Sequence, residues 1–346
     1  MEAAFPTSPA SPELSPQRLM QFTFGFAPPL IIEVAIRLKI FDVLDEGATT
    51  LEQLCRETHA SNRGLRAVLN ALVGLEMLRK DEEGRYALTP ESSMFLVTGK
   101  PTFHGAFFLL TREPMLTQWG KLYDIVRSGR PEHHINLPHD GVPFFLQFVE
   151  NIFAIHHPAA EKLADCLQVA QVKSSLSVLD LAAGSGVWSV ALAKRSRHVR
   201  VVAVDWPDII PVTGRVAAQN GVIDQYSFAA GDILDVDFGY GHAIATLGHI
   251  LHSEGDARSR QLLKKVFAAL APGGTVAIAE ILVDAERKQA LPALLFAVNM
   301  VVNSDHGDTF SFEEIADWLR DAGFSAVRTI DAPGLAPLLI LANKPD

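Results

Sequence analysis

Residues 177–205, which read SVLDLAAGSGVWSVALAKRSRHVRVVAVD, constrain the fold of this chain more than any other stretch. The first run, around Val178 and Leu179, is apolar on both faces, as a buried parallel strand requires. Small residues follow at 182–186 and leave the backbone open to a ligand, and residues 188–194 then predict a helix. A second strand over 199–204 ends at Asp205, where a ribose hydroxyl pair would find an acceptor. The stretch therefore predicts a strand–loop–helix–strand unit that holds a nucleoside at its strand ends.

The loop distinguishes between two classes of nucleoside ligand. A dinucleotide loop of the form G-x-G-x-x-G needs a third glycine, and Ser189 stands at that place, which disfavours a nicotinamide dehydrogenase. The pattern D-x-x-x-G-x-G, from Asp180 through Gly184 to Gly186, resembles motif I of class I S-adenosylmethionine (SAM) methyltransferases. Ala182 replaces the first glycine of that motif. We expect alanine to be tolerated there, provided that the backbone avoids positive φ.

Composition excludes several classes of protein. The chain has 346 residues, which is enough for two domains. Its formal net charge of −10 is unlike the basic face of a nucleic-acid binder. The two cysteines, Cys55 and Cys166, lie far apart and predict neither a disulfide framework nor a metal cluster. This cysteine usage fits a reducing cytoplasm. Charged residues and prolines interrupt the apolar stretches, so we expect no membrane span.

The chain is expected to divide into four parts. Residues 1–16 predict a flexible tail, and residues 17–100 predict a winged-helix domain, with helices over 17–44, 50–56 and 61–78 and a two-stranded wing around Gly84. Pro28 and Pro29 are expected to mark a break in its first helix. Residues 101–170 predict a helical linker that lines a substrate pocket, and residues 171–346 predict the nucleoside-binding domain. A winged helix can place its second helix in a DNA groove, but acidic neighbours favour a packing and dimerisation role.

The C-terminal part alternates between strand and helix patterns. Strands are expected at 226–229, 242–247 and 275–282, and helices at 259–270 and 311–322, the last with a capping box from Ser311 and Glu314. Residues 327–330 and 338–343 predict a terminal hairpin at the sheet edge. The fold class is therefore α/β, a Rossmann-like doubly wound sheet with an antiparallel edge strand, preceded by the mainly helical winged-helix domain.

The order of these pieces resembles the O-methyltransferase family that includes plant caffeate-type and acetylserotonin-type enzymes and their bacterial relatives. The similarity covers essentially the whole chain and rests on VLDLAAGSG, VVAVDWPDII, GDIL, HILHSEGDARSRQLLKKVFAALAPGG, AIAEILV and FSFEEIADWLRDAGF. It implies SAM as cofactor, S-adenosylhomocysteine as product and a homodimer. It also implies a set of cofactor-binding residues: Asp180, Gly184, Gly186, Asp205, Trp206, Gly231, Asp232 and Ile233.

Within that set the resemblance gives several residues separate roles. Asp180 frames the loop, Asp205 accepts the ribose hydroxyls, and Trp206 packs on the adenine or ribose. Asp232 and Ile233 contact the adenine, Asp232 through the exocyclic amine. A turn-capping role for Asp232 after Gly231 remains the alternative.

His252 is the expected general base, since the family's L-H-D-W pattern corresponds to Leu251, His252, Ser253 and Glu254. An imidazole can remove the proton of a phenol as its oxygen attacks the methyl group. The family has acidic residues that orient the base, and Glu280 matches one of them. The place of the second acid holds Thr309, with Asp308 beside it, so either Asp308 substitutes or the second partner is absent.

These features predict an O-methyltransferase acting on a phenol or enol of a small aromatic or polyketide-like metabolite. The alternatives are N- or C-methylation, a non-methylating rearrangement and, less favoured, a winged-helix regulator. A family lysine that touches the cofactor is missing, with Gly248 in its place and His249 following. We expect no metal site, because adjacent His156 and His157 would point apart on a helix.

Overall fold

The computed structural model describes residues 16, 19–20, 22–110, 115–334 and 337–346. The chain forms two compact units, Met1–Gly99 and Lys100–Asp346. Nearly all of the predicted tail, and residues 17, 18 and 21 of the first predicted helix, lie outside the described residues. No helix in the described part of the chain is both long and apolar enough to cross a membrane.

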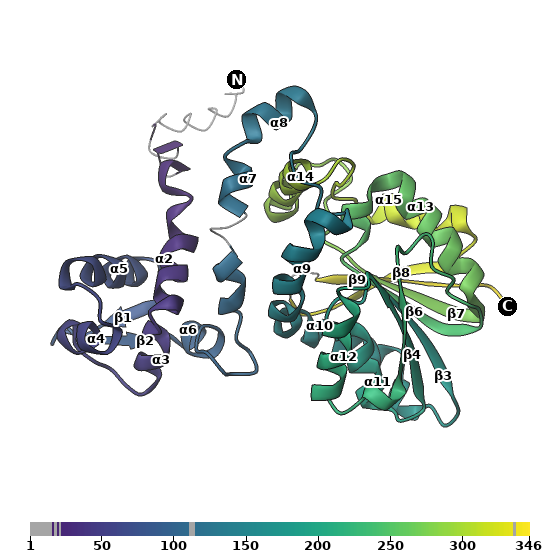
Figure 1. The fold of residues 1–346 in the computed structure, drawn as a ribbon, viewed down its shortest axis with the longest axis horizontal. Helices are drawn as coiled ribbons and strands as arrows, with labels where there is room; N and C mark the ends of the chain where they lie inside the picture. The colour runs from purple at the N-terminus through teal and green to yellow at the C-terminus, as the bar shows by residue number, and fades with distance from the viewer. Residues whose placement is uncertain (1–15, 17–18, 21, 111–114, 335–336) are drawn as a thin grey trace, which may run out of the picture. The chain divides into compact units, whose positions relative to one another are not determined.

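The first unit is a small helical domain with a two-stranded wing (Figure 1). Pro28 and Pro29 occupy the first turn of α2, where their missing N–H groups cost nothing, so they begin this helix rather than break it. The helix expected over 61–78 ends at Gly74, and its last predicted residue, Leu78, begins β1 instead. The elements of this unit are η1 (Phe22–Phe24), α2 (Ala27–Arg37), α3 (Ile40–Asp45), α4 (Leu51–Thr58), α5 (Asn62–Gly74), β1 (Leu78–Lys80), β2 (Tyr86–Leu88) and α6 (Pro90–Phe95).

The second unit begins with helices and continues into a seven-stranded sheet. Its helices before the sheet are η2 (Gly105–Leu110), α7 (Thr117–Trp119), α8 (Leu122–Ser128), α9 (Pro138–Asn151), α10 (Phe153–Cys166) and η4 (Val169–Gln171). The strands are β3 (Leu176–Leu181), β4 (Val199–Asp205), β5 (Tyr226–Ala230), β6 (His242–Gly248), β7 (Leu270–Ala279), β8 (Ser325–Asp331) and β9 (Leu338–Asn343). The intervening helices are α11 (Val187–Arg195), α12 (Ile210–Gln219), η5 (Ile223–Gln225), α13 (Leu251–Ala269), α14 (Leu291–Asn303) and α15 (Phe312–Ala322).

The strand order is β5-β4-β3-β6-β7-β9-β8, which confirms the predicted doubly wound fold. Strands β5, β4, β3, β6 and β7 are parallel, and β9 pairs antiparallel with both β7 and β8. The antiparallel strand is thus β9, one position inside the edge that β8 forms. The order reverses between β3 and β6, so ligands are expected at the carboxyl ends of these central strands.

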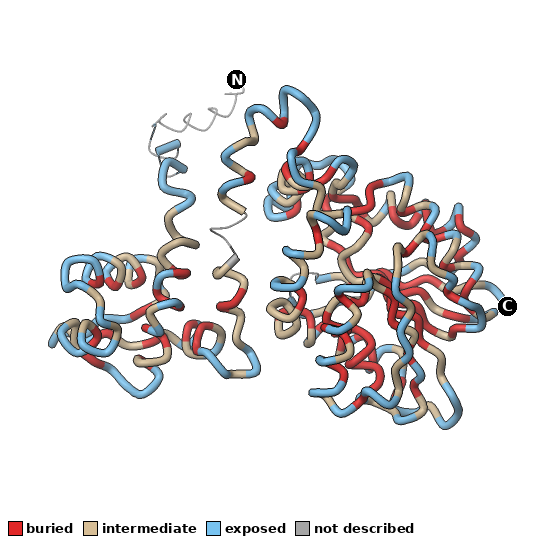
Figure 2. Tube along the Cα trace, viewed as in Figure 1, coloured by how far each residue is buried: buried red, intermediate tan, exposed pale blue. Residues whose placement is uncertain are grey.

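Helices cover both faces of the sheet. Side chains of α10, α11 and α12 pack on one face, and those of α13 and α15 pack on the other. Figure 2 shows the buried residues concentrated along the strands between these layers. Two long apolar interfaces therefore hold the strand ends in place, and the loops at those ends are free to bind ligands.

Two element boundaries differ from the sequence prediction near the site. Helix α13 begins at Leu251, eight residues earlier than expected, because Gly255 adopts φ 72° and joins a first turn to the main helix. His252 therefore lies in a helical turn and not in an open loop. Strand β7 ends at Ala279, three residues before the predicted end, so Glu280 follows the strand directly.

Candidate active site

The small-residue loop after β3 has the left-handed backbone conformations that a close approach to a ligand favours. Gly184 and Gly186 have φ of 55° and 72°. Ala182 also has positive φ, at 49°, so the expectation that alanine fits by avoiding this region was wrong. The loop accepts a local strain at Ala182, since an L-residue in this conformation costs on the order of 1 kcal/mol.

Asp180 lies beneath this loop and is fully buried. It accepts hydrogen bonds from the hydroxyl of Thr246 on β6, at 2.6 Å, and from the hydroxyl of Ser189 on α11. Burial raises the pKa of Asp180 to about 6, although these hydroxyls oppose the shift. Asp180 thus ties β3, β6 and α11 together, and it frames the loop from below without facing solvent.

Asp205 ends β4 and turns back to the same loop. Its carboxylate accepts the backbone N–H of Gly184 at 2.7 Å and that of Trp206 at 2.7 Å. Burial raises the pKa of Asp205 to about 6. The ring of Trp206 meets Phe145 of α9 edge-on, with ring centroids 5.9 Å apart, so α9 fixes the indole beside the strand end.

The third acid follows β5. Gly231 has φ 150°, and a Cβ there would lie 2.6 Å from Val236, so only glycine fits this turn. Its N–H donates to the Asp205 carbonyl at 2.9 Å, which joins the ends of β4 and β5. Asp232 accepts the N–H of Leu234 at 2.8 Å, as a turn-capping residue does, and Ile233 is buried behind it. Turn capping occupies one lone pair of Asp232 and leaves room for a ligand contact as well.

His252 and Glu280 meet at the ends of β6 and β7. Nδ1 of His252 lies 2.7 Å from Oε2 of Glu280, whose side chain is 3% exposed. Oε1 of Glu280 accepts the N–H of Leu251 at 2.7 Å. Burial would raise the pKa of Glu280, but the charge and hydrogen bond of His252, with smaller contributions from His249 and the Leu251 N–H, together lower it. A carboxylate in this position holds the proton on Nδ1 and leaves Nε2 as an acceptor.

Asp308 is joined to His252 through the backbone. Its N–H donates to the His252 carbonyl at 2.9 Å, and its carboxylate accepts the N–H of Thr309 at 2.7 Å. Thr309, at the place of the second family acid, is fully buried, and its hydroxyl has no hydrogen-bond partner among the described residues. The structure brings Glu280 to the His252 ring, whereas it brings Asp308 only to the His252 backbone.

Family models match both units of this chain. A model described as the O-methyltransferase dimerisation domain matches residues 20–98, and one described as the O-methyltransferase domain matches residues 119–325, more than half of the chain. The chain belongs to the O-methyltransferase family. It is therefore an enzyme that transfers methyl groups from SAM, as the sequence predicted.

Several known proteins are similar to this O-methyltransferase over nearly its whole length. The tetracenomycin polyketide synthesis 8-O-methyl transferase TcmO of Streptomyces glaucescens is 28% identical over 95% of this chain and 97% of its own. The 3-hydroxy-5-methyl-1-naphthoate 3-O-methyltransferase of Streptomyces sahachiroi is 27% identical over 91% of each chain. Among solved structures, a putative O-methyltransferase from Nostoc punctiforme superposes with a TM-score of 0.87 at 26% identity, covering 96% of this chain and 100% of that one.

Sequence reasoning missed a group of aromatic rings beside the base of this O-methyltransferase. His249 has φ 60°, and its ring lies against that of His156, tilted by 36° with centroids 4.3 Å apart. Burial lowers the pKa of His156 to about 4 and that of His249 well below its usual value, so both are neutral at pH 7. The run GHILH, with His249 and His252, was the available signal. His249 has a left-handed backbone at the strand end and His252 lies in a helical turn, and together these bring the two rings close to each other.

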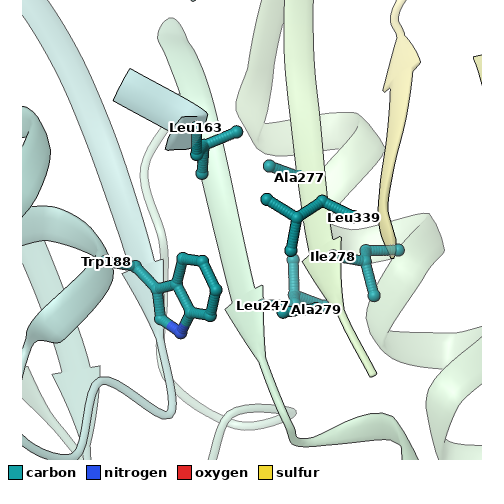
Figure 3. A pocket seen from close by; sticks show the side chains of 7 residues that line it. All are labelled: Leu163, Trp188, Leu247, Ala277, Ile278, Ala279 and Leu339. Atoms are coloured by element: carbon teal, nitrogen blue, oxygen red, sulfur yellow. The ribbon is translucent and has the colours of Figure 1, made fainter. Parts of the chain in front are cut away.

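Trp188 explains why residue 248 is a glycine. A Cβ on Gly248 would lie 1.9 Å from Nε1 of Trp188, so the indole occupies the space that a larger side chain would need. The same indole borders an apolar gap, too narrow for a water molecule, between α10, α11 and the strands (Figure 3). The gap is lined by Leu163, Trp188, Leu247, Ala277, Ile278, Ala279 and Leu339. This gap is part of the core and is not a ligand pocket.

One group of residues has the composition of a metal site. Candidate ligand atoms of His249, His252 and Glu280 all lie within 4.8 Å of one another. Zinc holds its ligand atoms about 2 Å away, so two ligands of one ion lie at most about 4 Å apart, and a spacing within 4.8 Å does not by itself decide for or against a zinc site. The expectation of no metal site remains a prediction, and chelation tests it.

Proposed function

We propose that this enzyme methylates a phenol or enol hydroxyl of a small aromatic or polyketide-like metabolite, with His252 as general base. The observation that carries the proposal is the contact between His252 Nδ1 and the buried Glu280 carboxylate, at 2.7 Å. A buried acid of lowered pKa on one ring nitrogen directs the other nitrogen toward a substrate proton. Phe296 packs edge-on against the same ring at 4.9 Å between centroids and limits its rotation.

Methyl transfer is a displacement in which the acceptor oxygen forms a bond to the methyl carbon as the carbon–sulfur bond breaks. SAM supplies the activated methyl group on its sulfonium. His252 Nε2 takes the hydroxyl proton as the oxygen attacks, and Glu280 stabilises the imidazolium that forms. General base catalysis of this kind contributes about 10²- to 10⁴-fold.

The residues at the strand ends suit SAM. The bare backbone at Gly184 and Gly186 allows close approach, and the Asp205 carboxylate at the end of β4 would hold the ribose hydroxyls. Trp206 would pack on the nucleoside, and Asp232 with Ile233 would contact the adenine. Asp180, fully buried, would act through the loop and not on the ligand.

Two relatives support this class of acceptor. One is named as an 8-O-methyl transferase of tetracenomycin polyketide synthesis, and the other as a 3-O-methyltransferase of a hydroxynaphthoate. N-Methylation remains the second candidate. The N,N-dimethyltransferase OxyT of Streptomyces rimosus is 23% identical over 98% of this chain and 99% of its own. Paired acceptors that differ only in a hydroxyl or an amine at the reacting position would decide between the two.

A homodimer is part of the proposal. Large apolar side chains at the start of the first unit are exposed, with Phe22 and Phe24 each 70% exposed and Leu19 likewise. Such a patch on a domain that matches a dimerisation model fits burial against a second copy. Sedimentation of the purified protein would show a dimer, and a monomer at micromolar concentration would contradict this part of the proposal.

The test of His252 uses His252→Ala and a matched control, His139→Ala, in which the side chain replaced is 70% exposed. Turnover is measured as S-adenosylhomocysteine formed with a phenol panel, and cofactor binding by calorimetry. We expect His252→Ala to lose at least about 100-fold in kcat and to bind the cofactor normally. Turnover equal to that of the control would remove His252 from the mechanism.

A further inference from the structure

The residues that follow His252 depart from the family pattern, and the structure shows what one of them does. Glu254 lies in the first turn of α13, two residues after the proposed base, and is 6% exposed. Its carboxylate forms an ion pair with Nε of Arg258, four residues further along the helix. Glu254 therefore holds the guanidinium of Arg258 from the helix side.

The other end of the guanidinium reaches the turn after β5, which contains Asp232. The Nη2 atom of Arg258 lies 3.1 Å from Oδ1 and 3.0 Å from Oδ2 of Asp232. The two residues are 26 positions apart in the chain, so the contact joins α13 to the turn after β5. Arg258 and Asp232 are both about a third exposed, so the geometry of this pair matters more than its contribution to stability.

The contacts leave Asp232 with one unused acceptor position. An ionised carboxylate has about four lone-pair directions. Among the residues that the structure describes, Oδ1 accepts from Leu234 N–H and from Arg258, and Oδ2 accepts from Arg258 alone. One lone pair of Oδ2 remains for a ligand, and the carboxylate is fixed on its other side.

We propose that Arg258, held by Glu254, is a positioning residue that aims the Asp232 carboxylate at a single N–H donor of the cofactor and thereby selects a 6-aminopurine. A 6-amino group donates to the remaining lone pair. A 6-oxo group presents a lone pair of its own at that place and is repelled. This inference rests on the proposed cofactor role of Asp232 and adds to it the residues that set its direction.

Lys265 supports the same turn from further along α13. Its ammonium donates to the carbonyls of Ile233 at 3.2 Å and Leu234 at 2.7 Å. The turn is thus fixed by one contact to the carboxylate and others to the backbone. Removing Arg258 should therefore release Oδ2 of Asp232, while the Leu234 N–H still holds Oδ1 and the turn itself stays in place.

The experiment compares binding of S-adenosylhomocysteine and of its 6-oxo analogue, S-inosylhomocysteine, by calorimetry on the whole protein. The variants are Arg258→Met and the double variant Glu254→Gln/Arg258→Met, which leaves no unpaired buried carboxylate. The matched control is Arg260→Met, because Arg260 lies on the same helix, forms its ion pairs among the described residues with the largely exposed Asp256 and Asp321, and otherwise lies over the Trp318 ring. Asp232→Asn tests the acid itself.

We expect the wild type and Arg260→Met to prefer the amino compound by about tenfold or more, the usual effect of one charge-assisted hydrogen bond. Both Arg258 variants should reduce that ratio to within about threefold, and their thermal unfolding should still be cooperative. Asp232→Asn should reverse the preference, since an amide can donate to the 6-oxo group.

An unchanged ratio in the Arg258 variants, with a changed ratio in Asp232→Asn, would overturn the role of Arg258 and leave the role of Asp232 intact. A ratio that Asp232→Asn leaves unchanged would overturn both. If the wild type binds neither compound, the proposed cofactor site itself fails.

Discussion

Replacing Glu280 by glutamine tests the proposed mechanism most sharply, because the change preserves shape and alters only which atoms donate. Glu280 accepts three hydrogen bonds: Oε1 accepts the backbone N–H of Leu251 at 2.7 Å and that of His252 at 3.4 Å, and Oε2 accepts His252 Nδ1 at 2.7 Å. Glutamine has one carbonyl oxygen and one amide nitrogen. The Leu251 N–H can only donate, so the oxygen must face Leu251 and the NH₂ must face His252.

That arrangement reverses the tautomer of His252. Nδ1 becomes the acceptor, the proton moves to Nε2, and Nε2 can no longer take a proton from the substrate. Turning the amide over would leave the buried Leu251 N–H unpaired, at about 1–3 kcal/mol. The loss of the carboxylate beside the imidazolium adds about 2–3 kcal/mol, so the barrier should rise by about 3–6 kcal/mol in all. This corresponds to a loss of about 10²- to 10⁴-fold in kcat.

The assay is single-turnover methyl transfer at saturating cofactor and acceptor, together with calorimetric binding of S-adenosylhomocysteine. Glu150→Gln is the matched control, because Glu150 forms an exposed ion pair with Arg215 and, among the described residues, no hydrogen bond to His252. We expect Glu280→Gln to bind the cofactor and unfold as cooperatively as the control. A folded Glu280→Gln enzyme with kcat within threefold of wild type would refute the tautomer argument.

Four further outcomes follow from the structure. The free energy of unfolding of Asp180→Asn, taken relative to wild type, should be about 1 kcal/mol higher at pH 7.5 than at pH 5, because an Asp180 pKa raised to about 6 stabilises the folded wild type as pH falls through 6. Denaturant unfolding at both pH values checks this, and a pH-independent difference would contradict it. Gly248→Ala should lower the free energy of unfolding by about 1–3 kcal/mol by displacing Trp188, and Trp188→Leu should reduce that effect in a double-mutant cycle; additive effects would show that the two sites do not interact. Treatment with a chelator should leave turnover unchanged, whereas a loss restored by zinc would make His249, His252 and Glu280 a metal site. Asp308→Asn should reduce kcat far less than Glu280→Gln, since only its backbone contacts His252, and an equal loss would identify Asp308 as the second acid.

The sequence predicted the framework of the site because its signals are local. A buried apolar run, a small-residue turn and a terminal acid identified β3, the loop and β4, and the capping box at Ser311 and Glu314 placed the start of α15. Glu280 was expected beside His252 from the family resemblance, and the structure supplies the physical reason, since β6 and β7 are adjacent parallel strands whose carboxyl ends meet. Hydrophobic period and capping chemistry suffice for predictions of this kind.

The remaining features depend on contacts between distant residues or on unusual backbone conformations. Nothing near Gly248 indicates that Trp188, sixty positions earlier, fills its space. The contact between Arg258 and Asp232 depends on how α13 lies against the turn after β5, which no periodicity encodes. Ala182 shows the same limit, since the strain of its positive φ is imposed by the surrounding loop and not by its own preference.

Gly255 divides α13 into two parts with different tasks. Its φ of 72° separates the first turn, which carries His252, from the main helix, which carries Arg258. A Cβ on Gly255 would lie 2.3 Å from the His306 carbonyl, so the joint is held by the segment that also contains Asp308. The ion pair between Glu254 and Arg258 joins the two parts across Gly255. We expect substitutions around residues 306–308 to shift the first turn and its base directly, and to reach the Asp232 turn through that ion pair, which would let one scaffold change its acceptor more readily than its methyl source.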